Sequence, residues 1–161
     1  MEGLGRLFDI SPIITPVDLN SAASTGNRVH LKNCSAVTFV VFVTAGANVS
    51  TIDLQEHDAA TGGTSQDLDI VDRCFVKSEA TLDGDETWTL TTQVAASEVA
   101  MGQNLQELWA IHVDASELSD TFEWVSVDIT DPGAAQVGCA IAILHDLNVQ
   151  RGPAQLVNPN A

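Results

Sequence analysis

The sequence predicts an all-β protein, a β-sandwich of the jelly-roll kind with extended N- and C-terminal arms. From residue 28 almost to the end, segments of alternating apolar and polar residues recur every 10 to 20 residues or so, separated by turn residues. Almost no segment has the 3.6-residue apolar period of a helix. The 161 residues suit a single domain, 1–161, with an arm at 1–16, a core at 17–149 and a second arm at 150–161.

The strands of the first half follow from apolar periodicity. Residues 37–44 are apolar on both faces, which is typical of a central strand. A half-buried strand is expected over 51–58, and it ends in the loop residues of 59–65. The segment 67–77 predicts a further strand, with a bulge or kink where the apolar phase slips at 70–71.

The second half continues the pattern. The Asp-Gly pair in 82–85 predicts a turn, and the β-branched and aromatic residues of 87–94 predict a strand after it. Residues 95–106 fit a strand, a loop or a short helix. Small residues on one face of the last strand would let another sheet or subunit approach closely. Three strands complete the predicted sandwich, at 108–113, 122–129 and 137–144.

The two ends are expected to differ from the core. Thr15 as an N-cap, Pro16 at the first helical position and Asp18 two residues later predict one helical turn. The proline-containing ends, 1–16 and 150–161, are interpreted as arms held by neighbouring subunits, because termini are ordered when something binds them.

The charge excludes common partner classes. The chain has 22 Asp and Glu against 6 Lys and Arg, a formal net charge of −16. Cationic side chains supply most of the affinity for phosphate backbones, so neither nucleic acid nor an anionic membrane is expected as a partner. With 17% charged residues and a mean hydropathy of +0.12, the chain is too apolar to be disordered. The carboxylates gather in the predicted turns 83–86 and 114–120, where they would face solvent, a basic partner or a salty environment.

Neither export nor disulfide bonding is indicated. The first residues lack a basic segment followed by an apolar one. The longest apolar stretches, 36–47 and 133–144, are too short to cross a bilayer and are interpreted as buried strands. Cys34, Cys74 and Cys139 are widely spaced and odd in number, which predicts small core residues in a reducing compartment rather than disulfides or a zinc site.

Catalysis has no motif in this sequence. There is no nucleophile elbow, no phosphate-binding glycine loop and no His-Glu-x-x-His pair, so we predict neither enzyme activity nor a cofactor. Adjacent residues of a strand point to opposite faces, which favours strand-end polar roles over metal binding for the histidines. These are His30, His57, His112 and His145.

Two groups of residues leave a binding role open. The acidic turn 83–86 could hold Ca²⁺, which takes carboxylate and carbonyl oxygens, or could be a solvated turn. Trp88, Trp109 and Trp124 could form a platform for sugars, but each lies in a predicted strand, which favours packing in the core or at a subunit interface.

Five segments spread over most of the chain carry a resemblance to a known family. They are Gly5-Arg6-Leu7-Phe8, Thr15-Pro16-Val17-Asp18-Leu19, Asn27-Arg28-Val29-His30-Leu31-Lys32-Asn33, Lys77-Ser78-Glu79-Ala80-Thr81-Leu82-Asp83-Gly84-Asp85-Glu86-Thr87-Trp88 and Asp146-Leu147-Asn148-Val149-Gln150-Arg151. These segments resemble small virion proteins of tailed bacteriophages, a group associated with capsid decoration, or cement, proteins.

The resemblance implies a trimeric β-sandwich protein of the virion, assembled in the bacterial cytoplasm. It would bind the major capsid protein on the outside of the head and bridge neighbouring subunits, which stabilises the shell. The expected contacts with capsid or neighbouring subunits are cationic and apolar residues near the arms and first strand. They are Arg6, Leu7, Phe8, Arg28 and Arg151.

Two other functions fit the same sequence. A glycan- or receptor-binding module on the virion surface would expose aromatic side chains. A head-completion or tail component would form a ring of fixed copy number instead of covering the shell.

Overall fold

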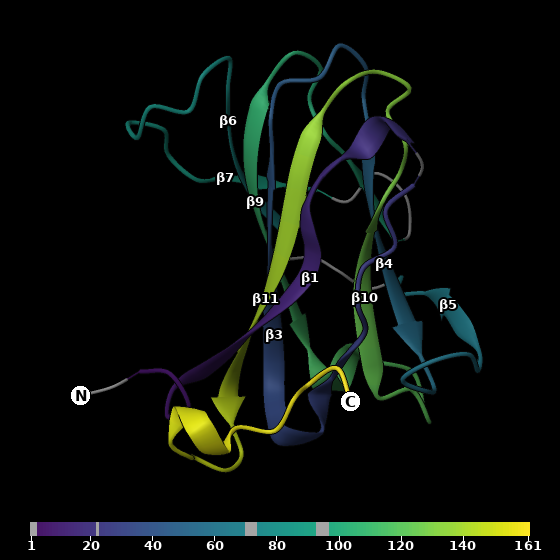
Figure 1. Ribbon diagram of the computed structural model, residues 1–161, viewed down its shortest axis with the longest axis vertical. Helices are drawn as coiled ribbons and strands as arrows, with labels where there is room; N and C mark the ends of the chain where they lie inside the picture. The colour runs from purple at the N-terminus through teal and green to yellow at the C-terminus, as the bar shows by residue number, and fades with distance from the viewer. Residues whose placement is uncertain (1–2, 22, 70–73, 93–96) are drawn as a thin grey trace.

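Two antiparallel sheets lie face to face in the computed structural model (Figure 1), which describes residues 3–21, 23–69, 74–92 and 97–161. The six-stranded sheet has the order β1 (Phe8–Asp18), β11 (Val137–Leu147), β3 (Cys34–Val43), β9 (Gln106–Asp114), β6 (Cys74–Glu79) and β7 (Thr89–Thr91). The five-stranded sheet has the order β2 (Val29–His30), β10 (Trp124–Ile129), β4 (Thr51–His57) and β5 (Ser65–Asp67), with β8 (Glu98–Ala100) also paired to β4. The predicted all-β sandwich is confirmed.

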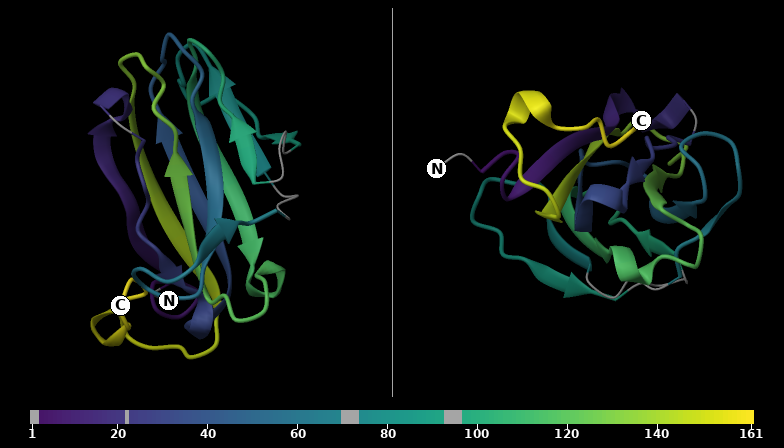
Figure 2. Two further views of the ribbon diagram at one scale, coloured as in Figure 1. Left: turned by 90° about the vertical axis from the view of Figure 1, so that its right-hand side faces the viewer. Right: turned by 90° about the horizontal axis from the view of Figure 1, so that it is seen from below.

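The core fills the space between the two sheets, which Figure 2 shows edge-on. Alternate residues of β3, Val37, Phe39 and Val41, are fully buried there, and Val125 and Val127 of β10 face them from the other sheet. β3 lies between β11 and β9, so the prediction of a central strand at 37–44 is confirmed. The strands predicted at 51–58, 108–113, 122–129 and 137–144 are also confirmed, with shifted ends.

The N-terminal arm and the helical turn were wrong predictions. Phe8–Asp18 pairs with β11 as an edge strand, and only the short 3₁₀ turn η1 (Leu19–Ser21) follows it. An edge strand tolerates Pro12 and Pro16 because its outer side needs no N–H donor. The register shifts on either side of Ile14 absorb the remaining irregularity.

The C-terminal segment 150–161 folds back on its own domain instead of extending as an arm. It contains the 3₁₀ turn η4 (Pro153–Gln155), and it crosses one end of the sandwich below both sheets. The His30 N–H donates to the Pro159 carbonyl at 2.9 Å, and the Asn160 side-chain amide donates to the Arg28 carbonyl at 2.8 Å. Backbone groups within this chain therefore hold the segment.

The middle of the chain also differs from the prediction. Residues 67–77 do not form one strand, because β5 and β6 lie in different sheets, and the predicted bulge at 70–71 lies outside the described residues. Of the strand expected at 87–94, the described residues 87–92 form only the short β7. Residues 95–106 contain β8. The remaining 3₁₀ turns are η2 (Leu31–Asn33) and η3 (Ala115–Glu117). Over the described residues, no helix has the length and apolar character needed to cross a membrane.

Candidate functional site

A row of apolar side chains crosses the full width of the outer face of the six-stranded sheet. Strand register places its outward side chains in rows, in which each residue lies opposite the next on the neighbouring strand. The central row crosses all six strands: Pro12, Ile141, Val40, Ala110, Phe75 and Leu90. The row on one side holds Cys139, Phe42 and Leu108, followed by Lys77. The row on the other side holds Ile10 and Ile143, followed by Thr38 and His112. We call the apolar residues of the three rows the apolar band.

Much of the apolar band lies open to solvent. Phe42 is 45% exposed, Ile10 47% and Leu90 61%. In a sandwich the side chains on the outer face of a sheet are normally polar. The outer face of the other sheet follows that rule with Asp53 and Asp128. Contiguous exposed apolar surface of this kind is typical of interaction sites.

Trp88 extends the apolar band at its β7 end. Its side chain is 47% exposed and lines a shallow apolar hollow with Phe75 and Ala110. The Lys77 ammonium lies 5.4 Å from the centre of the Trp88 ring, within cation–π range. Of the tryptophans predicted to pack in the core or at a subunit interface, Trp109 and Trp124 are buried within this chain, whereas Trp88 is exposed, which leaves the subunit-interface alternative for it.

A histidine pair borders the band at the opposite end of the strands. The rings of His112 and His145 stack with centroids 5.1 Å apart. His112 Nδ1 and His145 Nε2 lie 3.4 and 3.1 Å from the Thr38 hydroxyl. The other ring nitrogens contact Asp114 and Asp146 at 3.1 and 3.0 Å. Since a hydroxyl has one hydrogen, Thr38 can donate to only one imidazole at a time.

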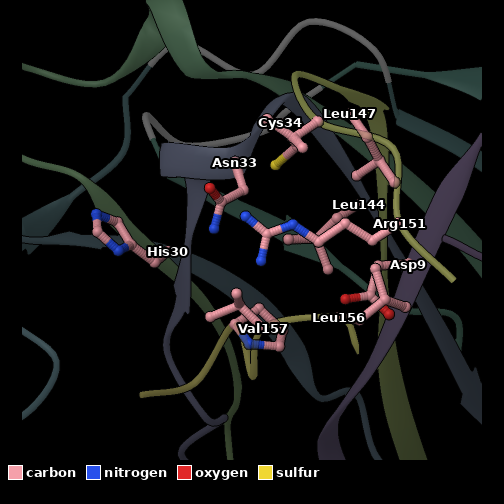
Figure 3. A pocket seen from close by; sticks show the side chains of 11 residues that line it. Asp9, His30, Asn33, Cys34, Leu144, Leu147, Arg151, Leu156 and Val157 are labelled. Atoms are coloured by element: carbon pink, nitrogen blue, oxygen red, sulfur yellow. The ribbon is translucent and has the colours of Figure 1, made fainter. Parts of the chain in front are cut away.

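Three of the predicted contact residues, Arg6, Leu7 and Phe8, lie beside a fourth, Arg151. The Arg151 N–H donates to the Gly5 carbonyl at 2.8 Å, which joins the two chain ends. Arg6 and Arg151 are exposed, and Leu7 is 61% exposed, whereas Phe8 is half-buried. Figure 3 shows the Arg151 side chain lying across a pocket, between Asp9 on one side and Asn33 on the other. The chain ends thus form an exposed cationic and apolar corner.

Arg28 is not part of this corner. Its guanidinium donates to the carbonyls of Ala59 and Gly62, both at 2.7 Å, and to the Ser65 hydroxyl at 3.0 Å. These three bonds hold the loop between β4 and β5. The structure therefore gives Arg28 a role inside the chain, while its external contact stays a prediction.

The predicted acidic turn lies on the loop between β6 and β7, which projects from the sandwich (Figure 1), and its carboxylates gather with that of Glu79 at the end of β6. Oxygen atoms of Glu79, Asp83, Asp85 and Glu86 lie within 4.8 Å of one another. The Glu86 carboxylate already accepts hydrogen bonds from the N–H groups of Asp83 and Gly84. The arrangement supports a solvated turn fixed by its own backbone.

Two cysteines are core residues, as predicted, and one is not. Burial raises the pKa of the Cys34 thiol to about 11 and that of the Cys74 thiol to about 12. Cys139 is half-buried and belongs to the outward row with Phe42. The reactivity of its thiol can therefore be used to probe whether the apolar band is covered.

The buried polar groups of the other sheet serve the fold. His57 contacts the hydroxyls of Ser65 and Ser126 through its two ring nitrogens, at 2.7 and 2.9 Å. Glu56, almost fully buried, accepts hydrogen bonds from the Gln66 amide at 2.6 Å and the Ser119 N–H at 2.7 Å. These hydrogen bonds of His57 and Glu56 are all made within the chain.

Comparisons with known proteins give no relative: no family model, curated protein or solved structure matches this chain.

Sequence reasoning missed the apolar band, although its signal was present. The segment 37–44 is apolar on both faces, and we interpreted this as burial on both sides. In a sandwich of two layers each sheet has only one inner face. An antiparallel strand with two apolar faces therefore predicts a further partner for its sheet.

Proposed function

We propose that this protein is a structural protein of a phage virion, a decoration protein that binds the outside of the head and bridges neighbouring major capsid proteins. The observation that carries this proposal is the apolar band, because an exposed apolar face of this extent indicates assembly with protein. The resemblance of the sequence to phage decoration proteins supports the choice of partner. Assembly would take place in the cytoplasm of the bacterial host.

The corner formed by the chain ends supports a second contact. Arg6 and Arg151 provide two of the few positive charges, next to the exposed Leu7. Decoration requires one surface for the shell and another for neighbouring copies, as in a trimer. A subunit with two separate contact surfaces meets this requirement. By mass action, a protein that binds only the completed shell stabilises it.

The strand order supports the jelly-roll assignment. β1, β3, β9 and β11 lie in one sheet and β2, β4, β5 and β10 in the other, so the chain crosses between layers at nearly every connection. The acidic residues of the segments 83–86 and 117–123 lie outside the strands, where they would keep crowded copies soluble.

Exposure of Trp88 favours a second candidate, a glycan-binding module at the virion surface. The Lys77 ammonium over the Trp88 ring competes with a stacked sugar for that face. A change in tryptophan fluorescence on adding oligosaccharides, lost in Trp88→Ala, would support this candidate over decoration.

Copy number on the particle tests the decoration proposal. Purified protein is added to heads that lack it, and bound copies are counted by quantitative gel analysis. We expect hundreds of copies per head, and a dozen or fewer would exclude decoration in favour of a head-completion or tail ring. Arg6→Glu and Arg151→Glu should each lower occupancy, whereas Arg28→Lys, which keeps its charge, should not. Unchanged occupancy for both Glu variants would rule out the corner as the shell contact.

A further inference from the structure

Strand register brings two imidazoles together on the outer face of the six-stranded sheet. His112 of β9 lies opposite Thr38 of β3. On its other side Thr38 lies opposite Ile143 of β11, two residues before His145. At this level β3 has only the small side chains of Ala36 and Thr38, so the long side chains of its two neighbours can meet above it. The two rings stack with centroids 5.1 Å apart and planes 30° from parallel.

Two carboxylates determine which nitrogen of each ring carries the hydrogen. His112 Nε2 lies 3.1 Å from Asp114, and His145 Nδ1 lies 3.0 Å from Asp146. An ionised carboxylate only accepts hydrogen bonds, so in a neutral imidazole the nitrogen that faces it is the donor. The other two nitrogens, His112 Nδ1 and His145 Nε2, then carry lone pairs.

Both lone pairs face a single hydroxyl. Thr38 Oγ1 lies 3.4 Å from His112 Nδ1 and 3.1 Å from His145 Nε2, but its one hydrogen can satisfy only one of them. The other nitrogen then faces the lone pairs of the same oxygen. A cation between the two nitrogens would bond to both. We infer that His112 and His145 form a binding site for a divalent transition metal ion such as Zn²⁺.

The carboxylates match the outer shell of a metal site. A histidine that binds a metal almost always donates its second ring N–H to a carboxylate, a carbonyl or a water, which fixes the tautomer and makes the ring a better ligand. Asp114 does this for His112, and Asp146 does it for His145. The side chains of the two histidines are 22% and 27% exposed, so an ion can reach them from solvent.

The backbone at Asp146 explains why sequence periodicity argued against metal binding. Adjacent residues of a regular strand point to opposite faces, which should separate His145 from Asp146. Asp146 has a φ of +55°, in the left-handed region, so the regular alternation is broken at this residue. Its carboxylate therefore reaches the imidazole of the residue before it. The second histidine comes from another strand, where the periodicity of one segment gives no information.

The donor set selects the class of metal. Imidazole nitrogen suits Zn²⁺, Cu²⁺ and Ni²⁺, whereas Ca²⁺ and Mg²⁺ prefer oxygen. Zinc takes nitrogen ligands at about 2.0–2.1 Å, closer than either nitrogen lies to Thr38, so both rings must turn toward the ion. A structural zinc site has four protein ligands. Two imidazoles leave positions for water, and we expect a reversible site that a chelator empties.

Calorimetric titration of the purified, untagged full chain with Zn²⁺ tests the inference. Ca²⁺ in excess occupies groups that offer only carboxylates, such as the acidic turn 83–86. We expect one Zn²⁺ to bind per chain. Asp114→Asn and Asp146→Asn should each lower the affinity about tenfold, because they remove the acceptor that orients a ring. Loss of a ligand in His112→Gln or His145→Gln should lower it further.

His30→Gln is the matched control. His30 also contacts a carboxylate, Glu123, at 2.9 Å, but its ring stacks on Trp124 instead of on a second imidazole. Its replacement should leave the zinc affinity unchanged. Cys139→Ser should also leave it unchanged, since Cys139 lies in the row on the other side of the central row.

The imidazole nitrogen signals of the wild-type chain locate the metal without any variant. Before zinc is added, long-range ¹H–¹⁵N spectra should show His112 with its hydrogen on Nε2 and His145 with its hydrogen on Nδ1, which are opposite tautomers. Zinc should shift the signals of His112 Nδ1 and His145 Nε2 and leave those of His30 in place.

Three results would overturn the inference. They are a chain that binds no zinc, histidine or Asn variants of the site that bind it as tightly as His30→Gln does, and bound zinc that leaves the signals of His112 and His145 unmoved. The site goes beyond the proposed function and does not rest on it. All these measurements use the free protein, so their failure leaves decoration of heads untouched, and failure to bind heads leaves the metal site untouched.

Discussion

The backbone N–H of Arg151 donates a hydrogen bond of 2.8 Å to the carbonyl of Gly5, which closes the last segment of the chain onto the first. Gly5 has a φ of +78°, in the left-handed region, and a Cβ at this position would collide with the Arg151 carbonyl. The corner at Arg6 and Arg151 thus depends on a residue without a side chain.

Gly5→Ala should therefore destabilise the protein by about 2 to 3 kcal/mol, from backbone strain together with the collision. The free energy of unfolding in urea measures this. Gly62→Ala is the control, because Gly62 also has a positive φ, +66°, but no atom lies within 4 Å of the added Cβ. It should cost about 1 kcal/mol. Equal losses in the two variants would show that the contact between the chain ends contributes nothing.

His57 should make the fold sensitive to mild acid. Burial, and then the charge of Arg28, lower the pKa of His57 to about 4. The unfolded chain binds a proton near pH 6.5, whereas the folded chain does so only near pH 4. The contribution of neutral His57 is thus complete above pH 6.5 and is lost progressively as the pH falls toward 4.

The loss should reach about 2 kcal/mol in wild type and be absent in His57→Gln, whose amide can still contact Ser65 or Ser126. Urea unfolding at several pH values between 7.5 and 4 gives the difference between the two proteins. A difference that does not change with pH would contradict the assignment.

Asp128 should make stability depend on pH in the direction opposite to His57. Burial raises the pKa of Asp128, against the hydrogen bond from the Gly26 N–H, and the charge of Asp53 adds to the rise. Asp53 Oδ1 is buried without a hydrogen-bond partner. Asp128→Asn removes the like charge and supplies an amide donor opposite Asp53, so it should stabilise the protein at pH 7 by about 1 kcal/mol.

The stabilisation by Asp128→Asn should decrease as the pH falls. A carboxyl group with a raised folded-state pKa takes up its proton in the folded protein before it does so in the unfolded chain, so wild type gains stability relative to Asp128→Asn as the pH falls through that value. The free energies of unfolding of wild type and Asp128→Asn at pH 7 and pH 4.5 show whether their difference changes in this direction. Destabilisation by Asp128→Asn at pH 7 would contradict it.

Periodicity was sufficient to predict the strands that pack in the core. β3, β4, β9, β10 and β11 were predicted because each alternates between core and exterior over six residues or more. The short strands β5, β7 and β8 were missed or misplaced. Three residues do not establish a period, and long-range pairing with β4 or β6 determines their position.

The ends of the chain were misread for a related reason. Prolines in β1 suggested an arm, because sequence does not reveal that a strand lies at the edge of a sheet. The candidate contact residues were predicted only in part. Arg6, Leu7 and Phe8 were predicted and do lie together with Arg151 at one end, but Phe42 was assigned to a buried strand and Phe75 was not singled out. The number of layers in the fold decides which apolar face is left open, and local sequence does not encode that number.

Alkylation of Cys139 measures most directly whether the apolar band is covered in the assembled state. Cys139 lies in the row with Phe42, while burial and raised pKa values protect Cys34 and Cys74. We predict that a maleimide labels one thiol in the dilute free protein, that Cys139→Ser abolishes this labelling, and that the rate falls at least about tenfold in protein bound to heads. Equal labelling rates for free and bound protein would mean that the band stays open, and would contradict its role as the face through which the protein assembles.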